Sequence, residues 1–390
     1  MFSISRFHAL IKGLPSGVID RIIQAQGADK YSKSFGCRHQ LIAMLYAQLA
    51  GVSSLRELES GFNSQSRHHY HLGMGVIRRS TLSDANRQRH PAVFADIARW
   101  LMSQACRGLR RDSKELLYLL DSTSISLTGR GFDEWTASTR TRRTQGIKVH
   151  VLYAVHEGVP SHQRITAANV NDVEEGRVLP IEAGATYVFD KGYCDYNWWL
   201  SITQAGARFV TRFKYNAALT VEAEKSIAPE VAGTILEDHV VRFRYRHSGG
   251  QRRNHYEQPL RRIVVMRPDK DRPLVLATND LESSAEDIAR LYKDRWQIEL
   301  FFKWIKQHLK IKRFLGRSKN AVHIQVLMAL ITYLLLSLYQ AKYELTQSLW
   351  LVLAELRQTL FQRQGTEIAL LERRRKRHID LTTHQTAFCP

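Results

Sequence analysis

The stretch around which the chain is organised lies near residue 300, where apolar and polar positions follow a helical pattern. Residues 291–309 contain neither glycine nor proline, and their apolar side chains recur at helical spacing. We therefore predict one long helix, buried on most of its surface, with Ser283 or Ser284 available to cap its start. At about 100° per residue, four polar residues share one narrow stripe of this helix: Tyr292, Arg295, Glu299 and Lys306.

The polar stripe has two interpretations. It is either a solvated helix face with charge pairs such as Arg295 with Glu299, or part of a functional site. The apolar residues around it favour a site, because an enclosed carboxylate is costly unless a cation compensates it. A site of this kind needs partners elsewhere in the chain.

The N-terminal region is helical by the same criterion. Apolar residues at mixed three and four spacing predict about four short helices between Phe7 and Phe62. Farther on, Thr81 and Asp84 form a potential capping box that opens another helix. Three arginines accompany this helix and are candidates for phosphate contact: Arg78, Arg79 and Arg87.

Between residues 112 and 280 the hydrophobic pattern changes to short apolar runs. Leu116–Leu120 and Ala185–Phe189 have the pattern of buried strands, and they end in Asp121 and Asp190. Catalytic residues of sheets tend to lie at such strand ends, although an aspartate there is commonly a turn residue. Further strands are expected at residues 149–155, 163–167, 208–214, 240–246, 262–266 and 274–277, and helices at 172–183 and 195–205.

Charge narrows the class of partner. Lysine and arginine outnumber aspartate and glutamate by 57 to 37, which gives a net charge of +20. A surplus of this size favours nucleic acid over an anionic lipid surface. In residues 240–246, within the β-rich segment 215–280, cations alternate with apolar residues. The basic face of this segment is either a solvated strand edge or a DNA groove.

Cysteine and histidine spacing disfavours several other classes. The four cysteines form no C-x-x-C pair, which disfavours a zinc knuckle and a disulfide framework and suits a reducing cytoplasm. The histidines of residues 67–71 match no zinc pattern and suit a loop or a packing junction. Val326–Tyr339 is shorter than the ~20 residues that span a bilayer, so it is expected to be a core helix, with no membrane partner.

Three carboxylates now stand out: Asp121 and Asp190 after strands, and Glu299 on the long helix. Hard divalent cations take oxygen ligands, and two such ions can hold the attacking and leaving oxygens of a phosphoryl transfer. The three residues are therefore candidates for a site that binds two magnesium or manganese ions. A strand-end aspartate or a charged helix face alone would be weak evidence.

The chain resembles the bacterial transposases of the insertion-sequence-four group. The helix matches that family's Y-(2)-R-(3)-E-(6)-K signature from Tyr292 to Lys306. Leu119–Thr123 and Asp190–Tyr193 match its two aspartate blocks, and the regions 35–62 and 70–86 resemble the helical domain of one branch. The resemblance extends over nearly the whole chain, apart from about the last 45 residues.

This resemblance implies an α+β protein: an RNase H-like catalytic core with a β-rich insertion, preceded by an all-α domain. It implies that Asp121, Asp190 and Glu299 hold two Mg²⁺ or Mn²⁺ ions. One ion would activate a water molecule that cleaves the DNA at the element's end. The exposed 3′-hydroxyl group would then attack target DNA. The expected DNA contacts are Tyr292, Arg295, Lys306, Lys148, Arg78, Arg79, Arg87, Lys310 and Arg313.

Some choices remain open within this resemblance. Lys148 and His150 are either near the site or packed within a strand pair. Some relatives form a DNA hairpin with the help of an aromatic residue in the insertion, where Tyr245 and Tyr256 are candidates here. A nuclease of the same fold and an inactive DNA-binding repressor of transposition are the alternative functions.

The resemblance also implies partners and a division of the chain. The partners are the element's terminal inverted repeats and target DNA, bound by a homodimer in the bacterial cytoplasm near the nucleoid. The expected parts are a helical DNA-binding domain (1–75), linking helices (76–111), the first part of the core (112–214), the β-rich insertion (215–280), the second part of the core (281–345), and a helical segment with a basic tail (346–390).

Overall fold

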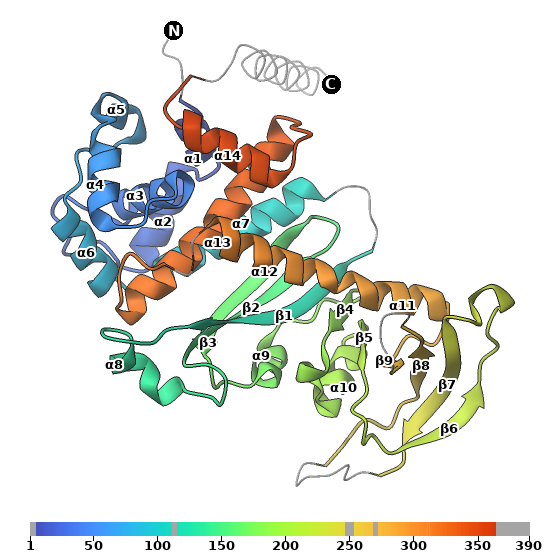
Figure 1. Ribbon diagram of the computed structural model, residues 1–390. Coiled ribbons are helices and arrows are strands. Elements are labelled where there is room, and N and C mark those ends of the chain that lie inside the picture. Colours follow the sequence, from blue (N-terminus) through green and yellow to red (C-terminus); the bar gives the residue numbers. More distant parts are fainter. Residues whose placement is uncertain are drawn as a thin grey trace, which may run out of the picture. The chain divides into compact units, whose positions relative to one another are not determined.

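The computed structural model describes residues 5–110, 115–245, 253–267, 272–309, 311 and 313–363 (Figure 1). Lys310 and the basic tail after residue 371 lie outside the described residues. The chain forms two compact units, residues 1–109 with 304–390, and residues 110–303. The limits of these compact units differ from the six parts expected from the sequence. Those parts were assigned by function, and that assignment stays a prediction.

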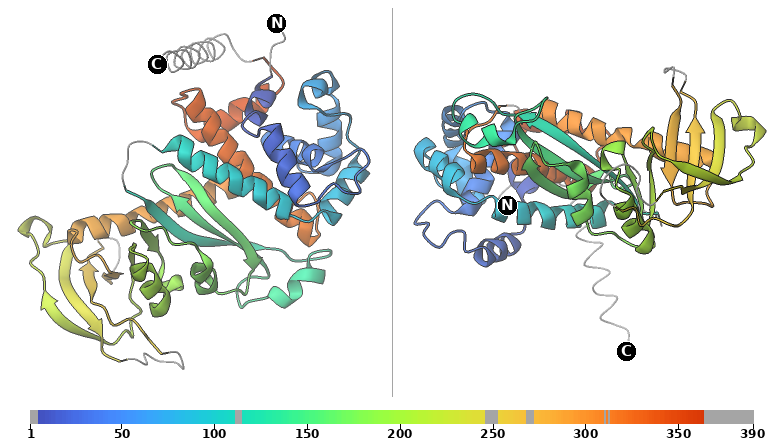
Figure 2. Two further views of the ribbon diagram at one scale, coloured as in Figure 1. Left: turned by 180° about the vertical axis from the view of Figure 1, so that it is seen from behind. Right: turned by 90° about the horizontal axis from the view of Figure 1, so that it is seen from below.

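The first unit is helical and is built around one apolar helix. Its helices are α1 (Arg6–Ile11), α2 (Ser16–Ala25), α3 (Cys37–Ala50), α4 (Leu55–Asn63), α5 (His69–Leu72), α6 (Arg79–Gln88), α7 (Ala92–Leu109), α13 (Lys319–Lys342) and α14 (Leu349–Thr359). Helix α13 packs against α7, α3, α6 and α14 (Figure 2). It is long and apolar enough to cross a membrane, but 83% of its most apolar window is buried inside the protein. The prediction of a core helix is thus confirmed.

The N-terminal predictions are largely confirmed, with one correction. Four helices, α1 to α4, lie between Arg6 and Asn63 as expected. The predicted capping box is wrong, because α6 already begins at Arg79, whose backbone N–H donates to Glu59 Oε1 at 2.9 Å. Asp84 instead forms an ion pair with Arg87 at 2.9 Å.

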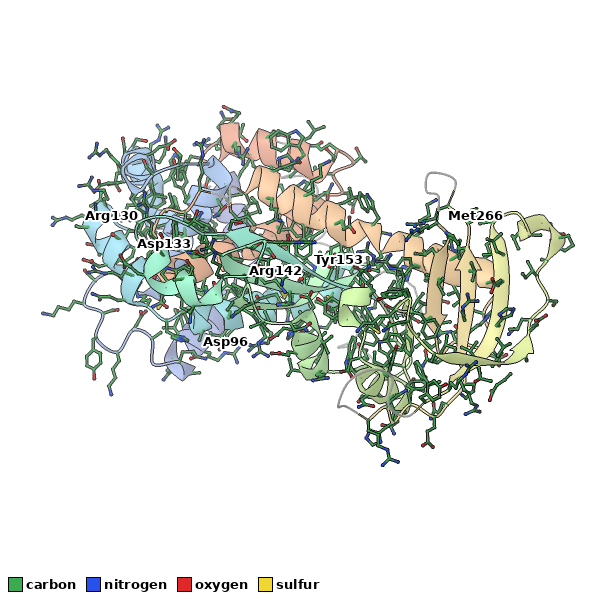
Figure 3. All side chains as sticks on the ribbon, turned by 60° about the horizontal axis from the view of Figure 1, so that its bottom comes forward. Asp96, Arg130, Asp133, Arg142, Tyr153 and Met266 are labelled. Atoms are coloured by element: carbon green, nitrogen blue, oxygen red, sulfur yellow. The ribbon has the colours of Figure 1, made fainter. Side chains whose placement is uncertain are left out.

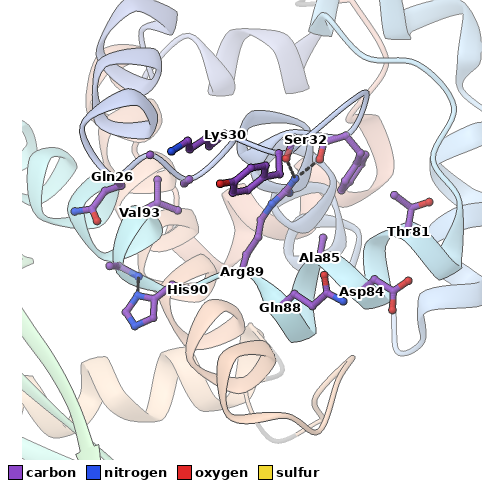
Figure 4. Close-up of a pocket in the computed structure, with 15 residues that line it drawn as sticks. Gln26, Lys30, Ser32, Thr81, Asp84, Ala85, Gln88, Arg89, His90 and Val93 are labelled. Atoms are coloured by element: carbon purple, nitrogen blue, oxygen red, sulfur yellow. Dashed lines mark hydrogen bonds between the residues drawn. The ribbon is translucent and has the colours of Figure 1, made fainter.

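A pocket of about 510 Å³ opens in the first unit between residues 26–35 and the region around α6 (Figure 4). Arg89 reaches into it and donates to Gln40 Oε1 at 2.9 Å and to Ser32 Oγ at 3.2 Å. The same guanidinium donates to the carbonyl of Phe35. Since Arg89 is bound to protein oxygens, it acts here as an anchor for the loop before α3.

The second unit contains a nine-stranded sheet in the order β3-β2-β1-β4-β5-β9-β8-β7-β6. Strands β1, β4 and β5 are parallel, and the other neighbours are antiparallel. The strands are β1 (Leu117–Ser126), β2 (Gly146–Ala154), β3 (Val159–Ala167), β4 (Thr186–Phe189), β5 (Arg208–Arg212), β6 (Leu219–Glu224), β7 (Ile235–Phe243), β8 (Leu260–Val265) and β9 (Leu274–Thr278).

The β-rich insertion continues the core sheet. Strand β9 pairs with β5 through Val210 and Thr278, so β6 to β9 extend the five core strands at one edge. Inside the insertion, Arg261 forms an ion pair with Asp238 at 2.5 Å, and both side chains are only 2% exposed. Such a buried pair is fully compensated and fixes the register of β7 and β8.

The helices of the second unit are α8 (Asp133–Thr136), α9 (Asp172–Val178), α10 (Tyr196–Gln204), α11 (Ala285–Asp294) and most of α12 (Trp296–His308). Ser284 caps α11, as predicted. The single long helix was wrong, because the chain breaks into α11 and α12 at Arg295. The N–H of Arg295 bonds to the carbonyl of Tyr292, three residues back, at 3.3 Å. Burial was also overestimated, since Trp296 is 58% and Leu300 49% exposed.

Candidate active site

Strands β1 and β4 bring the two aspartates together. They are parallel and about 4.8 Å apart, with Leu120 opposite Phe189. The next residue along each chain segment is an aspartate, Asp121 or Asp190, so the two lie side by side. Asp190 follows the last residue of β4, as predicted. Asp121 lies inside β1, which continues to Ser126, so its predicted place at a strand end was wrong.

The junction of α11 and α12 adds the third carboxylate. Arg295 donates to Glu299 Oε1 at 2.6 Å and to Asp121 Oδ2 at 3.4 Å. The Tyr292 hydroxyl donates to Asp190 Oδ1 at 3.4 Å. Tyr292 therefore contacts Asp190, and Arg295 connects Asp121 to Glu299. The break at Arg295 lies where its side chain joins these two carboxylates.

Arg212 is a component that the sequence analysis did not select. It is the last residue of β5, and its guanidinium donates to Asp190 Oδ1. It also lies 6.0 Å from the centroid of the Tyr292 ring. The signal was present, since β5 is the third parallel strand and ends in a cation, but the pairing of β5 with β4 was needed to select it.

The charges of this group do not balance. Asp121, Asp190 and Glu299 contribute three negative charges against two positive charges from Arg212 and Arg295. Burial raises the pKa of Asp121 to about 6, and the charges of Glu299 and Asp190 act in the same direction. Burial also raises the pKa of Asp190, but its hydrogen bond and ion pair with Arg212 contribute to a net shift below its usual value.

The donor set suits a hard divalent cation. Across the part of the chain that the structure describes, no group of three acidic, histidine or cysteine side chains is arranged so that it could hold a metal ion, and arginines engage the three carboxylates. Carboxylate oxygens are nevertheless the ligands that Mg²⁺ and Mn²⁺ prefer. The excess negative charge and the raised pKa of Asp121 are what a bound cation would correct.

Lys148 belongs to the opposite face of the sheet. It lies opposite Ser124 on β1, whereas Asp121 lies opposite Val151, so the two side chains point to different faces. Its ammonium donates to Val170 O at 2.8 Å and to Asp172 Oδ1 at 3.1 Å. The structure therefore does not bring Lys148 to the three carboxylates. Of the two alternatives, packing within the strand pair describes its contacts.

The remaining predicted contacts belong to the first unit. Arg78, Arg79, Arg87 and Arg313 have exposed side chains there, and Lys306 is half-buried on α12. In the same unit His69 stacks on Phe62 at 4.4 Å between ring centroids, which is the packing junction expected for the histidines. In the insertion, Tyr256 is only 2% exposed, whereas Tyr245 is 57% exposed, so Tyr245 is the accessible hairpin candidate.

Comparison with known families gives a consistent result. The family model described as "Transposase DDE domain" matches residues 112–335, and one described as "Domain of unknown function (DUF4372)" matches residues 3–75. The chain is 43% identical over 294 residues to "Putative transposase y4zB" of Sinorhizobium fredii, covering 75% of this chain and 79% of that protein. It is 26% identical over 322 residues to "Probable transposase for insertion sequence element IS5377" of Geobacillus stearothermophilus, covering 82% and 80%.

The fold has a counterpart among solved structures. A piggyBac transposase, solved in a synaptic complex with hairpin DNA, matches with a TM-score of 0.50 and 12% sequence identity. The match covers 94% of this chain and 81% of that one. The predicted α+β class with an RNase H-like core is thereby confirmed.

Proposed function

This chain belongs to the DDE transposase family and is a DNA transposase, and we propose that it cuts both ends of an insertion sequence and joins the exposed 3′-hydroxyl groups to target DNA. The observation that carries the proposal is the meeting of Asp121, Asp190 and Glu299. They come from two strands and a helix junction separated by 69 (190 − 121) and 109 (299 − 190) residues, yet are joined through Arg295, Tyr292 and Arg212.

The three carboxylates would hold two Mg²⁺ or Mn²⁺ ions. When bound, such ions supply an activated nucleophile and stabilise the charge that develops on the leaving oxygen. Arg295 and Arg212 now bind these carboxylates. In the loaded site their guanidinium groups would be available to the phosphate beside the cut, which each could bind through two N–H groups at once.

Tyr292 keeps these arginines in place. Its ring lies 5.8 Å from Arg295 and 6.0 Å from Arg212, measured from ring centroid to guanidinium carbon. The buried Nε atoms of both arginines have no hydrogen-bond partner among the described residues, so each has a donor to spare. We include Tyr292, Arg295 and Lys306 in the phosphate-binding group, as the family signature implies.

The wider assignments belong to the same proposal. Residues 1–75 would bind the terminal repeats, with Arg78, Arg79, Arg87, Lys310 and Arg313 as added phosphate contacts. Two copies of the chain would pair the two ends as a homodimer before cutting. The protein would act in the bacterial cytoplasm at the nucleoid.

The test uses a supercoiled plasmid that carries the DNA flanking both sides of the gene. With Mg²⁺ and the full-length protein we expect nicks at the element's ends, followed by joined products, and with a chelator neither. Cutting without joining would overturn the proposal in favour of a nuclease. Binding without cutting, in Mg²⁺ and in Mn²⁺, would favour a transposition repressor.

A further inference from the structure

The connection between β1 and β2 is a folded element in its own right. Its backbone is held by threonine hydroxyl groups: Thr136 Oγ1 donates to Leu127 O at 3.0 Å, and Thr139 Oγ1 donates to Gly146 O at 2.8 Å. Asp133 accepts from Gly129 N and from Gln145 Nε2, at 3.1 and 2.7 Å. This connection therefore has a defined shape before any ligand is bound.

Arginines project from this element. Arg130, Arg140, Arg142 and Arg143 are all exposed, and Figure 3 labels Arg130 next to Asp133, with Arg142 farther along the molecule. Within the described ranges, the guanidinium groups of Arg140, Arg142 and Arg143 make no ion pair. By contrast, the exposed Arg99 of α7 is paired with Asp96 at 2.6 Å.

Three of these arginines flank one hydroxyl in a tight turn, residues 140–144, which we call the arginine turn. Thr141 N donates to Thr144 O at 2.8 Å, and Thr141 Oγ1 accepts from Thr144 N at 2.9 Å and Arg143 N at 3.2 Å. The backbone is thus fixed while the cationic ends stay in solvent. A surface prepared in this way loses less entropy when it binds a regular array of anions.

The arginine turn is followed closely by β2, whose first residue lies at a defined distance from Asp121. Asp121 is opposite Val151, and β2 begins at Gly146, five residues before it. At about 3.3 Å per residue the start of β2 is about 17 Å from Asp121. That is the length of about five base pairs of duplex DNA, at 3.4 Å each.

We propose that the arginine turn is a docking surface for the phosphate backbone of duplex DNA, about five base pairs from the phosphate that is cut. The inference rests on the proposed function, which places a duplex at the carboxylates. Arginine suits this task, because its planar guanidinium can donate two parallel hydrogen bonds to one phosphate. The turn would fix the position of the duplex without reading its sequence.

The first test is the salt dependence of binding to a 40-base-pair duplex of arbitrary sequence, measured by fluorescence anisotropy with the full-length protein. Each lost phosphate contact lowers the slope of log K against log salt by about 0.9. For the triple variant Arg140→Ala/Arg142→Ala/Arg143→Ala, the magnitude of this slope should fall by about two to three. For the variant with lysine at all three positions, the slope should stay close to that of the wild type.

A matched control removes the same net charge elsewhere. Arg99, Arg107 and Arg164 are exposed, but each already bonds within the protein, to Asp96, Ser103 O and Glu175. Replacing these three by alanine should leave the slope unchanged. An equal slope for wild type and the Arg140, Arg142 and Arg143 triple variant, with both proteins folded by circular dichroism, overturns the docking surface.

The second test is an ethylation interference footprint on an element end. Ethylation of phosphates about five base pairs from the cut should prevent binding by the wild-type protein. The same ethylation should not affect binding by the triple variant. This outcome is separate from the proposed function: a wild-type protein that cuts and joins, with no such phosphates, refutes the docking surface alone. A wild-type protein that does not cut refutes the proposed function, whatever the salt slope of the turn.

Discussion

The two faces of the sheet at strand β1 contact similar charged residues, but the balance of charge differs between the faces. On one face Asp121 shares Arg295 with Glu299, and its contact with that arginine is long, at 3.4 Å. On the other face Asp172 Oδ1 accepts from Ser122 Oγ at 2.8 Å and Lys148 Nζ at 3.1 Å, with His150 Nδ1 at 3.7 Å. Around Asp121 the carboxylates outnumber the cations, whereas Asp172 is one carboxylate with several donors.

The difference separates a site from a support. A carboxylate surrounded by donors is compensated and holds secondary structure together, as Asp172 holds the start of α9 to β1 and β2. A cluster with excess negative charge is compensated only in part, so it is prepared for a further cation. The presence of aspartates and lysines near a strand therefore does not identify a site, whereas the balance of charge does.

The largest effect should come from the carboxylates of the undercompensated face. Asp121→Asn, Asp190→Asn and Glu299→Gln should each lower DNA cutting by about a thousand-fold or more, about 4 kcal/mol in the barrier. The measurement is the initial rate of plasmid nicking in Mg²⁺. Asp121→Asn should also leave the free energy of unfolding unchanged or higher at pH 7, since burial disfavours the charged form of Asp121. Unfolding of this variant, or cutting within tenfold of wild type, would erase the distinction between the faces.

Substitutions on the compensated face should lower the stability of the protein. Asp172→Ala leaves the Lys148 ammonium, 13% exposed, with only the Val170 carbonyl among the bonds described here. Removing one partner of such a pair should lower the free energy of unfolding by about 3 kcal/mol, measured by urea titration. Asp172→Asn is the control, because it keeps an oxygen acceptor. If Asp172→Ala were stable but unable to cut DNA, Asp172 would belong to the site.

His150 gives the compensated face a pH dependence. Burial lowers the pKa of His150 to about 4, from 6.5, so the folded protein binds fewer protons than the unfolded chain between these values. Stability from this residue is present above pH 6.5 and is lost as the pH falls toward 4. The loss between pH 6.5 and 5 should be about 1.6 kcal/mol, because the unfolded-state histidine is already half-protonated at pH 6.5.

The variant that isolates this effect is His150→Gln, which keeps a polar group beside Thr166. Urea unfolding at both pH values should show a smaller change for the variant than for wild type. Buried His323 also has a pKa lowered to about 4, but it is common to both proteins and cancels in the difference. Equal pH dependence would mean that His150 is charged or accessible in the folded state.

Sequence patterns located the elements of the site better than they located its contacts. The helix bearing Tyr292, Arg295 and Glu299 was predicted from periodicity, and Asp190 from its position after a buried run. Periodicity could not show the break at Arg295, because that break depends on bonds to residues far away in the sequence. Arg212 was missed and Lys148 selected for one reason: which face a strand residue points to, and which strands are neighbours, depend on register.

The smallest effect tests whether an arginine stands in for a metal ion on the undercompensated face. Arg212 occupies Asp190 Oδ1, so a cation must displace it. Arg212→Gln removes this competitor and a positive charge, and should tighten Mn²⁺ binding by about tenfold, or 1.4 kcal/mol, by isothermal titration calorimetry. The control is Arg164→Gln, which removes an exposed charge paired with Glu175. It should change the affinity less than about twofold, because an exposed charge at a distance is screened. If Arg212→Gln binds Mn²⁺ no more tightly than wild type, Arg212 supports Asp190 as Lys148 supports Asp172. The two faces would then differ in charge balance alone, without a cation held in place of the metal.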